Sequence, residues 1–138
     1  MQASKICFEL TETAATATLG LTADLLLALK DLGCRFALDD FGGGLSSYTD
    51  VKNLPADIVK IDGAFIRDMD RNAADRNVVQ SVHDLAHHLG KLTVAEFVET
   101  EDVYQQAREL GLDYVQGYHV ERPCPLDELG LQRLDLPV

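Results

Sequence analysis

The chain has 138 residues, of which 46% are hydrophobic and 25% are charged, values typical of one soluble globular domain. Its formal net charge of −11, from 12 basic and 23 acidic residues, excludes the basic face that nucleic-acid polymers require. No apolar run is long enough to span a membrane, and no signal peptide is expected at the N-terminus. The three cysteines lack C-x-x-C spacing, so we expect reduced thiols in a cytoplasmic protein.

Strand-like and helix-like segments alternate along the chain. Apolar patterns predict strands over residues 6–11, 35–41, 58–65, 92–98 and 114–120. Amphipathic patterns predict helices behind a cap at Thr22, over residues 46–51 and 73–89, behind Thr100 and behind Pro125. The buried stripe expected for the first helix is Leu25, Leu26, Leu29 and Leu32. Strict alternation predicts an α/β fold with a parallel sheet and right-handed crossovers.

Polar side chains fall late in each predicted strand. They are Glu9 and Glu12, Asp39 and Asp40, Lys60 and Asp62, Glu96 and Glu99, and Gln116. In α/β barrels the carboxyl ends of the strands carry the chemistry, so we expect these side chains to share one face of the molecule. Most of them are carboxylates, which repel one another unless cations lie between them.

Asp39 and Asp40 end an apolar strand and precede a glycine run, residues 42–44. Successive residues of a regular strand face opposite sides, so both carboxylates reach one ligand only where the strand is distorted. The glycines allow such a distortion, and the pair would then enclose a cation. The other interpretation of these residues is a strand that ends in an ordinary turn.

Mg²⁺ or Mn²⁺ bound through oxygen is the simplest compensation for the expected carboxylates. Two ions that share a bridging carboxylate would activate a water and stabilise a phosphodiester transition state. We expect Asp39 to be the bridge, with Glu9 toward one ion and Asp40 toward the other. Lys60, the one base among these acids, would hold the attacking water or a phosphate oxygen.

Simpler interpretations exist for several residues. Glu12 and Glu99 would cap the helices that follow them, and Asp62 would only anchor a turn. His83 and His87 lie one helical turn apart, a spacing that suits zinc, although such a pair is more often a solvated helix face.

Five segments in order carry the residues described above. They are Phe8–Thr13, Asp39–Ser47, Val59–Asp62, Val94–Thr100 and Gln116–Tyr118. In order and spacing they resemble the EAL domain, the bacterial cyclic di-GMP phosphodiesterase family. The resemblance implies hydrolysis of one phosphodiester of cyclic di-GMP, giving linear pGpG, with Mg²⁺ or Mn²⁺ as cofactor.

The resemblance also implies a role for each matching residue. The implied metal ligands are Glu9, Asp39 and Asp40. The implied catalytic residues, which organise the metal-bound water and the second ion, are Lys60, Glu96 and Gln116. Glu12 would steady the loop after the aspartates. The residues that would support the ligands from behind are Asp62 and Glu99.

The chain lacks the Glu-Ala-Leu motif and supplies five of the eight units of a (β/α)8 barrel, which usually takes about 250 residues. We therefore expect residues 1–138 to form a truncated domain, a partial barrel without its first strands and without two of the family's metal ligands. Phe97 stands where the family usually has glycine, and Gly43 where it usually has threonine.

A partial barrel leaves sheet edges open at residues 6–11 and 114–120, where a second copy or a partner chain would pair. Two functions stay open. One is a cyclic di-GMP phosphodiesterase that is inactive or weakly active alone. The other is a degenerate module that acts through protein contacts or nucleotide sensing, and a fragment without an independent role is a third possibility.

Overall fold

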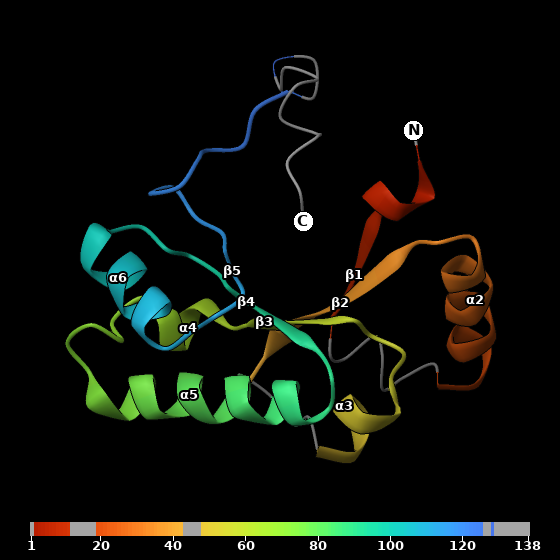
Figure 1. Cartoon of the computed structure of the whole chain (residues 1–138), viewed down its shortest axis with the longest axis horizontal. Helices are drawn as coiled ribbons and strands as arrows, with labels where there is room; N and C mark the ends of the chain where they lie inside the picture. The colour runs from red at the N-terminus through yellow and green to blue at the C-terminus, as the bar shows by residue number, and fades with distance from the viewer. Residues whose placement is uncertain (1, 12–18, 43–47, 126–127, 129–138) are drawn as a thin grey trace.

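The computed structural model describes residues 2–11, 19–42, 48–125 and 128. Five parallel strands form one sheet in the order of the chain (Figure 1). They are β1 (Cys7–Thr11), β2 (Arg35–Phe41), β3 (Ile58–Ile61), β4 (Leu92–Ala95) and β5 (Tyr114–Val115). This confirms the predicted α/β fold with a parallel sheet.

The α-helices connect the strands and lie around one side of the sheet (Figure 1). They are α2 (Leu19–Asp31), α3 (Tyr48–Asn53), α4 (Gly63–Ile66), α5 (Ala73–His88) and α6 (Glu101–Glu109), and the 3-10 turn η1 (Ala3–Lys5) precedes β1. Alternate strand residues face opposite sides, and Leu38 and Val59 join the large core beneath these helices. Ala37 and Ile58 belong to a smaller cluster. Burial of the large core is what holds the strands at fixed positions for the site.

The first helix differs from its prediction. It begins at Leu19, so Thr22 lies within it and does not cap it. Leu26 is only 3% exposed, whereas Leu25 and Leu32 are 60% and 69% exposed, so the four leucines do not form one buried stripe. The helix lies at the β1–β2 end of the sheet (Figure 1), and Leu26 is on its buried side.

Three strands are shorter than predicted, and the polar residues follow their ends. The strand β3 stops at Ile61 because Asp62 turns the chain into α4, its carboxylate accepting from the backbone nitrogen of Ala64 at 2.8 Å. The strand β4 stops at Ala95, directly before Glu96. The strand β5 contains two residues, and Gln116 follows it. Glu12, Gly43 and most of the helix expected behind Pro125 lie outside the described residues.

The two predicted open edges are present in the described part of the sheet. The strand order places β1 at one edge and β5 at the other. Phe8 on β1 is 40% exposed, although its ring stacks on Phe36. Among the residues that the structure describes, no helix combines the length and apolarity needed to cross a membrane.

Candidate functional site: carboxylates around a buried lysine

Lys60 on β3 lies at the centre of a group of carboxylates from three neighbouring strands. Its ammonium is 2.8 Å from Glu96 Oε1, 2.9 Å from Glu9 Oε1 and 3.3 Å from Asp39 Oδ1. The lysine side chain is only 5% exposed. Glu9 lies at the middle of β1, Asp39 lies in the carboxyl half of β2 and Glu96 directly follows β4, so the structure brings these predicted side chains together.

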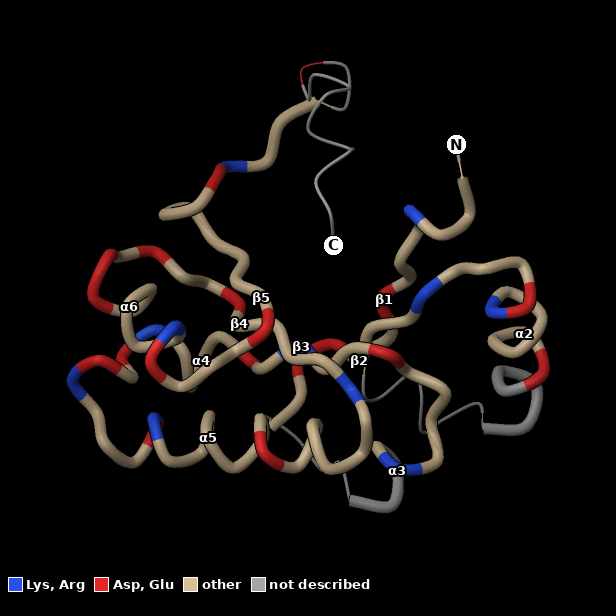
Figure 2. Tube along the Cα trace, in the orientation of Figure 1, with Lys and Arg blue, Asp and Glu red and all other residues tan. Residues whose placement is uncertain are grey.

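The carboxylates around Lys60 give this part of the protein a strongly negative net charge. Acidic residues outnumber basic ones along most of the chain (Figure 2). Burial by itself would lower the pKa of Lys60, but hydrogen bonds and ion pairs with Glu96 and Glu9 raise that pKa well above its usual range. Burial raises the pKa of Glu96, and Asp39 and Asp40 raise it further, which outweighs the effect of Lys60. One permanent ammonium therefore does not neutralise the carboxylates.

A distortion at the end of β2 brings the two adjacent aspartates to the same side. Asp40 has a φ of +57°, in the left-handed region that few residues other than glycine adopt. The pairing of β2 with β3 shifts register between Leu38 and Phe41, as at a β-bulge. As a result, carboxylate oxygens of Asp39, Asp40 and Glu96 lie within 4.8 Å of one another.

These three carboxylates suit a divalent cation. Asp39 Oδ1 and Glu96 Oε2 are buried and accept no hydrogen bond from any described residue, although Asp39 Oδ1 lies 3.3 Å from the Lys60 ammonium. Buried oxygens without donors are costly unless a cation lies against them. An all-oxygen ligand set of this kind is preferred by Mg²⁺, Mn²⁺ and Ca²⁺. Glu9 is outside the group of three, because its half-exposed carboxylate is directed to Lys60.

A cavity of about 190 Å³ adjoins Glu96. It is lined by Glu96, Phe97, Glu99, Gln116, Gly117 and Tyr118. The backbone of Gln116 is fixed here by two bonds, its nitrogen donating to Ala95 O at 2.8 Å and its carbonyl accepting from Val98 N at 3.1 Å. The predicted residues Glu96, Glu99 and Gln116 therefore line one cavity.

The alternatives for Asp62 and Glu99 are resolved differently. Asp62 caps α4, so it does anchor a turn. Glu99 does not cap α6, because Thr100 does so by accepting from Val103 N at 3.3 Å. Glu99 is exposed at the rim of the cavity instead.

Sequence reasoning missed the aromatic part of the cavity wall. Phe97 and Tyr118 line it, and both rings are largely exposed, at 44% and 56%. A basic side chain lies over each ring, with Arg67 at 4.5 Å from the Phe97 centroid and Arg122 at 4.7 Å from the Tyr118 centroid. The only signal in the sequence was that each aromatic residue adjoins a polar motif residue.

Phe97 occupies a backbone position that favours glycine. Its φ is +55°, and its ring lies directly on Gly63, where an added Cβ would be 2.1 Å from the ring. The ring of Phe97 therefore fits here only because Gly63, the first residue of α4, has no side chain. This explains how the chain accommodates Phe97 where a smaller residue was expected.

Gly63→Ala is expected to destabilise the protein by about 2 kcal/mol, because the new methyl overlaps the Phe97 ring. In a Phe97→Gly background the same change should cost less than about 0.5 kcal/mol, since the obstacle is gone. Urea unfolding of the four proteins in this double-mutant cycle measures the difference. Equal costs in both backgrounds would contradict the described contact.

Comparison with known proteins agrees with this geometry. The family model described as "EAL domain" matches residues 1–123. "Cyclic di-GMP phosphodiesterase PdeB" from Shewanella oneidensis is 44% identical over 121 residues, which are 88% of this chain and 14% of that protein. The chain thus spans a small part of that relative.

Solved structures give the same result. The EAL domain of Mycobacterium smegmatis DcpA has a TM-score of 0.84 at 33% identity, over 95% of this chain and 60% of that one. The manganese and cyclic di-GMP complex of Klebsiella pneumoniae BlrP1 has a TM-score of 0.83 at 30% identity, over 90% of this chain and 32% of that one. These likenesses confirm a partial barrel. The chain belongs to the EAL domain family.

Proposed function

We propose that the chain provides the carboxylate face of a divalent-metal phosphodiesterase that hydrolyses cyclic di-GMP to linear pGpG, with little or no activity alone. The observation that carries this proposal is the group of Asp39, Asp40 and Glu96, whose ligand atoms lie within 4.8 Å of one another and which includes two buried oxygens that accept no hydrogen bond. Relatives named for this activity add support.

In this proposal Asp39 and Asp40 hold Mg²⁺ or Mn²⁺, and Glu9 joins them by turning from Lys60. The bound ions would polarise the phosphodiester and acidify a water. Lys60 keeps its proton, so it fixes the carboxylates and donates to a phosphate oxygen. Glu96 and Gln116 orient the attacking water from the cavity wall. Glu12 would steady the loop after the aspartates, and Glu99 would support the ligands from behind.

Asp39→Asn is expected to weaken Mn²⁺ binding on the order of 100-fold, because it removes a charged ligand from the centre of the group. Isothermal titration of the purified chain measures this. Asp62→Asn is the matched control, since asparagine keeps the oxygen that accepts from Ala64 N and caps α4, so stability and Mn²⁺ affinity should both stay nearly unchanged. Unchanged Mn²⁺ affinity in Asp39→Asn would reject the proposed site.

A second candidate function is a noncatalytic module that acts through protein contacts. It is favoured by the open edges at β1 and β5 and by the exposed side chains of Phe8, Leu25 and Leu32. Such edges and apolar side chains favour a second copy or a partner chain. A cytoplasmic location belongs to both proposals, because the cysteines are free thiols.

Hydrolysis of cyclic di-GMP with Mn²⁺, measured together with the mass of the chain in solution, tests the proposal. Turnover that is lost in Asp39→Asn would establish the phosphodiesterase, and turnover confined to an oligomer would show that association completes the site. Absence of turnover at every mass, with Mn²⁺ bound, would leave the noncatalytic module.

A further inference from the structure

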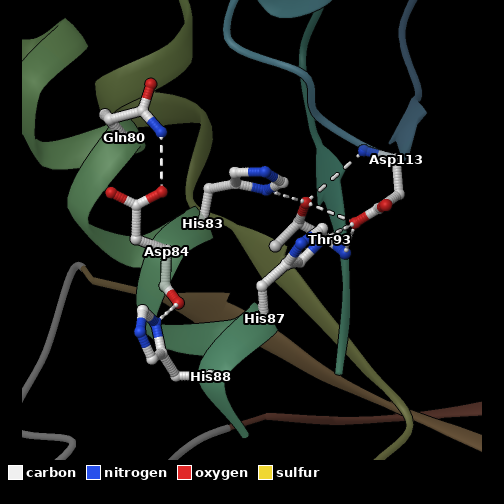
Figure 3. A network of polar contacts seen from close by, with 7 residues as sticks. All are labelled: Gln80, His83, Asp84, His87, His88, Thr93 and Asp113. Atoms are coloured by element: carbon white, nitrogen blue, oxygen red, sulfur yellow. Dashed lines mark hydrogen bonds and ion pairs between the residues drawn. The ribbon is translucent and has the colours of Figure 1, made fainter. Parts of the chain in front are cut away.

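A second group of polar side chains lies at the opposite, amino-terminal ends of the strands (Figure 3). His83 and His87 on α5 meet Thr93, the second residue of β4, and Asp113, which precedes β5. His83 Nδ1 is 2.8 Å from Thr93 Oγ1, and His87 Nε2 is 2.7 Å from Asp113 Oδ2. His83 is only 7% exposed, so the expected solvated helix face was wrong for this residue, because α5 turns it toward β4.

The hydrogen bonds determine which nitrogen of His83 carries the proton. Thr93 donates its hydroxyl proton to Asp113 Oδ2 at 3.0 Å, since a carboxylate only accepts. Thr93 Oγ1 must then accept from the Nδ1–H of His83, which leaves Nε2 as the nitrogen with the lone pair. Burial lowers the pKa of His83, and the nearby His87 lowers it further, which favours the neutral ring. A neutral imidazole held by a hydrogen bond at one nitrogen is the usual state of a metal ligand.

The fold repeats this arrangement with a different cation. Asp57 precedes β3, accepts from the backbone nitrogen of Phe36 at 2.9 Å, and pairs at 2.7 Å with Lys30 in the last turn of α2. Asp113 precedes β5, accepts a backbone bond of 2.8 Å from β4, and meets His87 in the last turn of α5. Asp57 has the ammonium of Lys30 beside it. Asp113 has imidazoles in the corresponding place, and an imidazole is positive only when it is protonated or bound to a cation.

We propose that His83, His87 and Asp113 bind a divalent transition-metal ion of the zinc class. One ligand atom from each residue lies within 4.8 Å of the others, and the two imidazole centroids are 4.1 Å apart. Three protein ligands with a water in the fourth position form a common tetrahedral zinc site. His87 is 43% exposed, which gives an ion access from solvent and lets the side chain adjust around it.

The two metal groups of the chain would select different ions. Imidazole nitrogen favours Zn²⁺ and Co²⁺, whereas the all-oxygen group at Asp39 favours Mg²⁺ and Mn²⁺. An ion at the histidines would join α5 to the segment before β5, in the way that Lys30 joins α2 to the segment before β3. It should therefore raise the melting temperature of the folded chain.

The test is a calorimetric titration of the metal-free full chain with Zn²⁺ in the presence of excess Mg²⁺. A second titration with Co²⁺ is followed by visible absorption spectroscopy. We expect one equivalent to bind, with a tetrahedral Co²⁺ spectrum that lacks thiolate bands. His87→Gln should weaken binding by about 10-fold or more. His88→Gln is the matched control, because His88 is exposed on the same helix and bonds only to Asp84 O in the described network.

Three results would overturn the proposal. The first is equal Zn²⁺ affinity in His87→Gln and the unchanged chain, which would leave a hydrogen-bonded cluster only. The second is Zn²⁺ binding that Asp39→Asn abolishes, and the third is a Co²⁺ spectrum with thiolate bands. Circular dichroism confirms that His87→Gln is folded, which we expect because its side chain is largely at the surface.

Discussion

Lys60→Met is expected to lower the free energy of unfolding by about 3 kcal/mol in EDTA. The change removes the ammonium that contacts Glu9, Asp39 and Glu96 and leaves their carboxylates facing one another. Removal of one partner of a buried ion pair lowers the free energy of unfolding by about this amount, because the remaining charged groups stay buried without a partner. Methionine fills a similar volume, so the loss would report charge and not a cavity.

Urea unfolding with and without Mn²⁺ measures this effect. Mn²⁺ should restore part of the lost stability, because the ion compensates the same carboxylates. Lys30→Met is the control, since the Lys30–Asp57 pair is about one-third exposed on each side and should cost about 1 kcal/mol, with no response to Mn²⁺. Equal losses in the two variants would contradict the central role of Lys60.

Gly117→Ala is expected to destabilise the chain by about 3 kcal/mol or more. An added Cβ would lie 2.2 Å from Val98 O and 2.4 Å from Val98 N, and both are backbone atoms that cannot rotate away. The same two atoms hold the segment in place, with Val98 N bonded to Gln116 O and Val98 O to His119 N. The substitution should therefore also displace Gln116 from the cavity.

Gly111→Ala is the matched control for this prediction. Gly111 has a φ of +76°, but nothing lies within 4 Å of its added Cβ, so alanine should cost about 1 kcal/mol from backbone strain alone. Denaturant unfolding compares the two variants. Similar decreases in the free energy of unfolding for Gly117→Ala and Gly111→Ala would show that the close approach of Gly117 to Val98 does not prevent a side chain at position 117.

Local patterns predicted the elements whose limits are set locally. The strand β2 has the predicted bounds Arg35–Phe41, and Thr100 caps its helix as expected. The ends of β3, β4 and β5 were placed too late, because apolar patterns continue past the point where the chain leaves the sheet. The burial of His83 was missed for a related reason, since only tertiary packing turns a polar helix face inward.

The candidate site was predictable in its location more than in its geometry. Parallel strands share one carboxyl edge, which is enough to place Glu9, Asp39 and Lys60 together. The left-handed φ of Asp40 and the contact of Phe97 with Gly63 depend on pairing and packing between distant segments. The metal-binding and catalytic roles of the site residues therefore remain predictions, which Mn²⁺ titration and hydrolysis of cyclic di-GMP test.

The order of the sheet has a consequence for how the chain acquires its structure. Every strand pairs with the strand next to it in the sequence, and each connection between parallel partners contains one helix or two. Each unit therefore needs only the preceding unit as a template, and loop closure remains local throughout. Folding can advance along the sheet from β1 to β5 as the polypeptide emerges during synthesis, without waiting for its last residues.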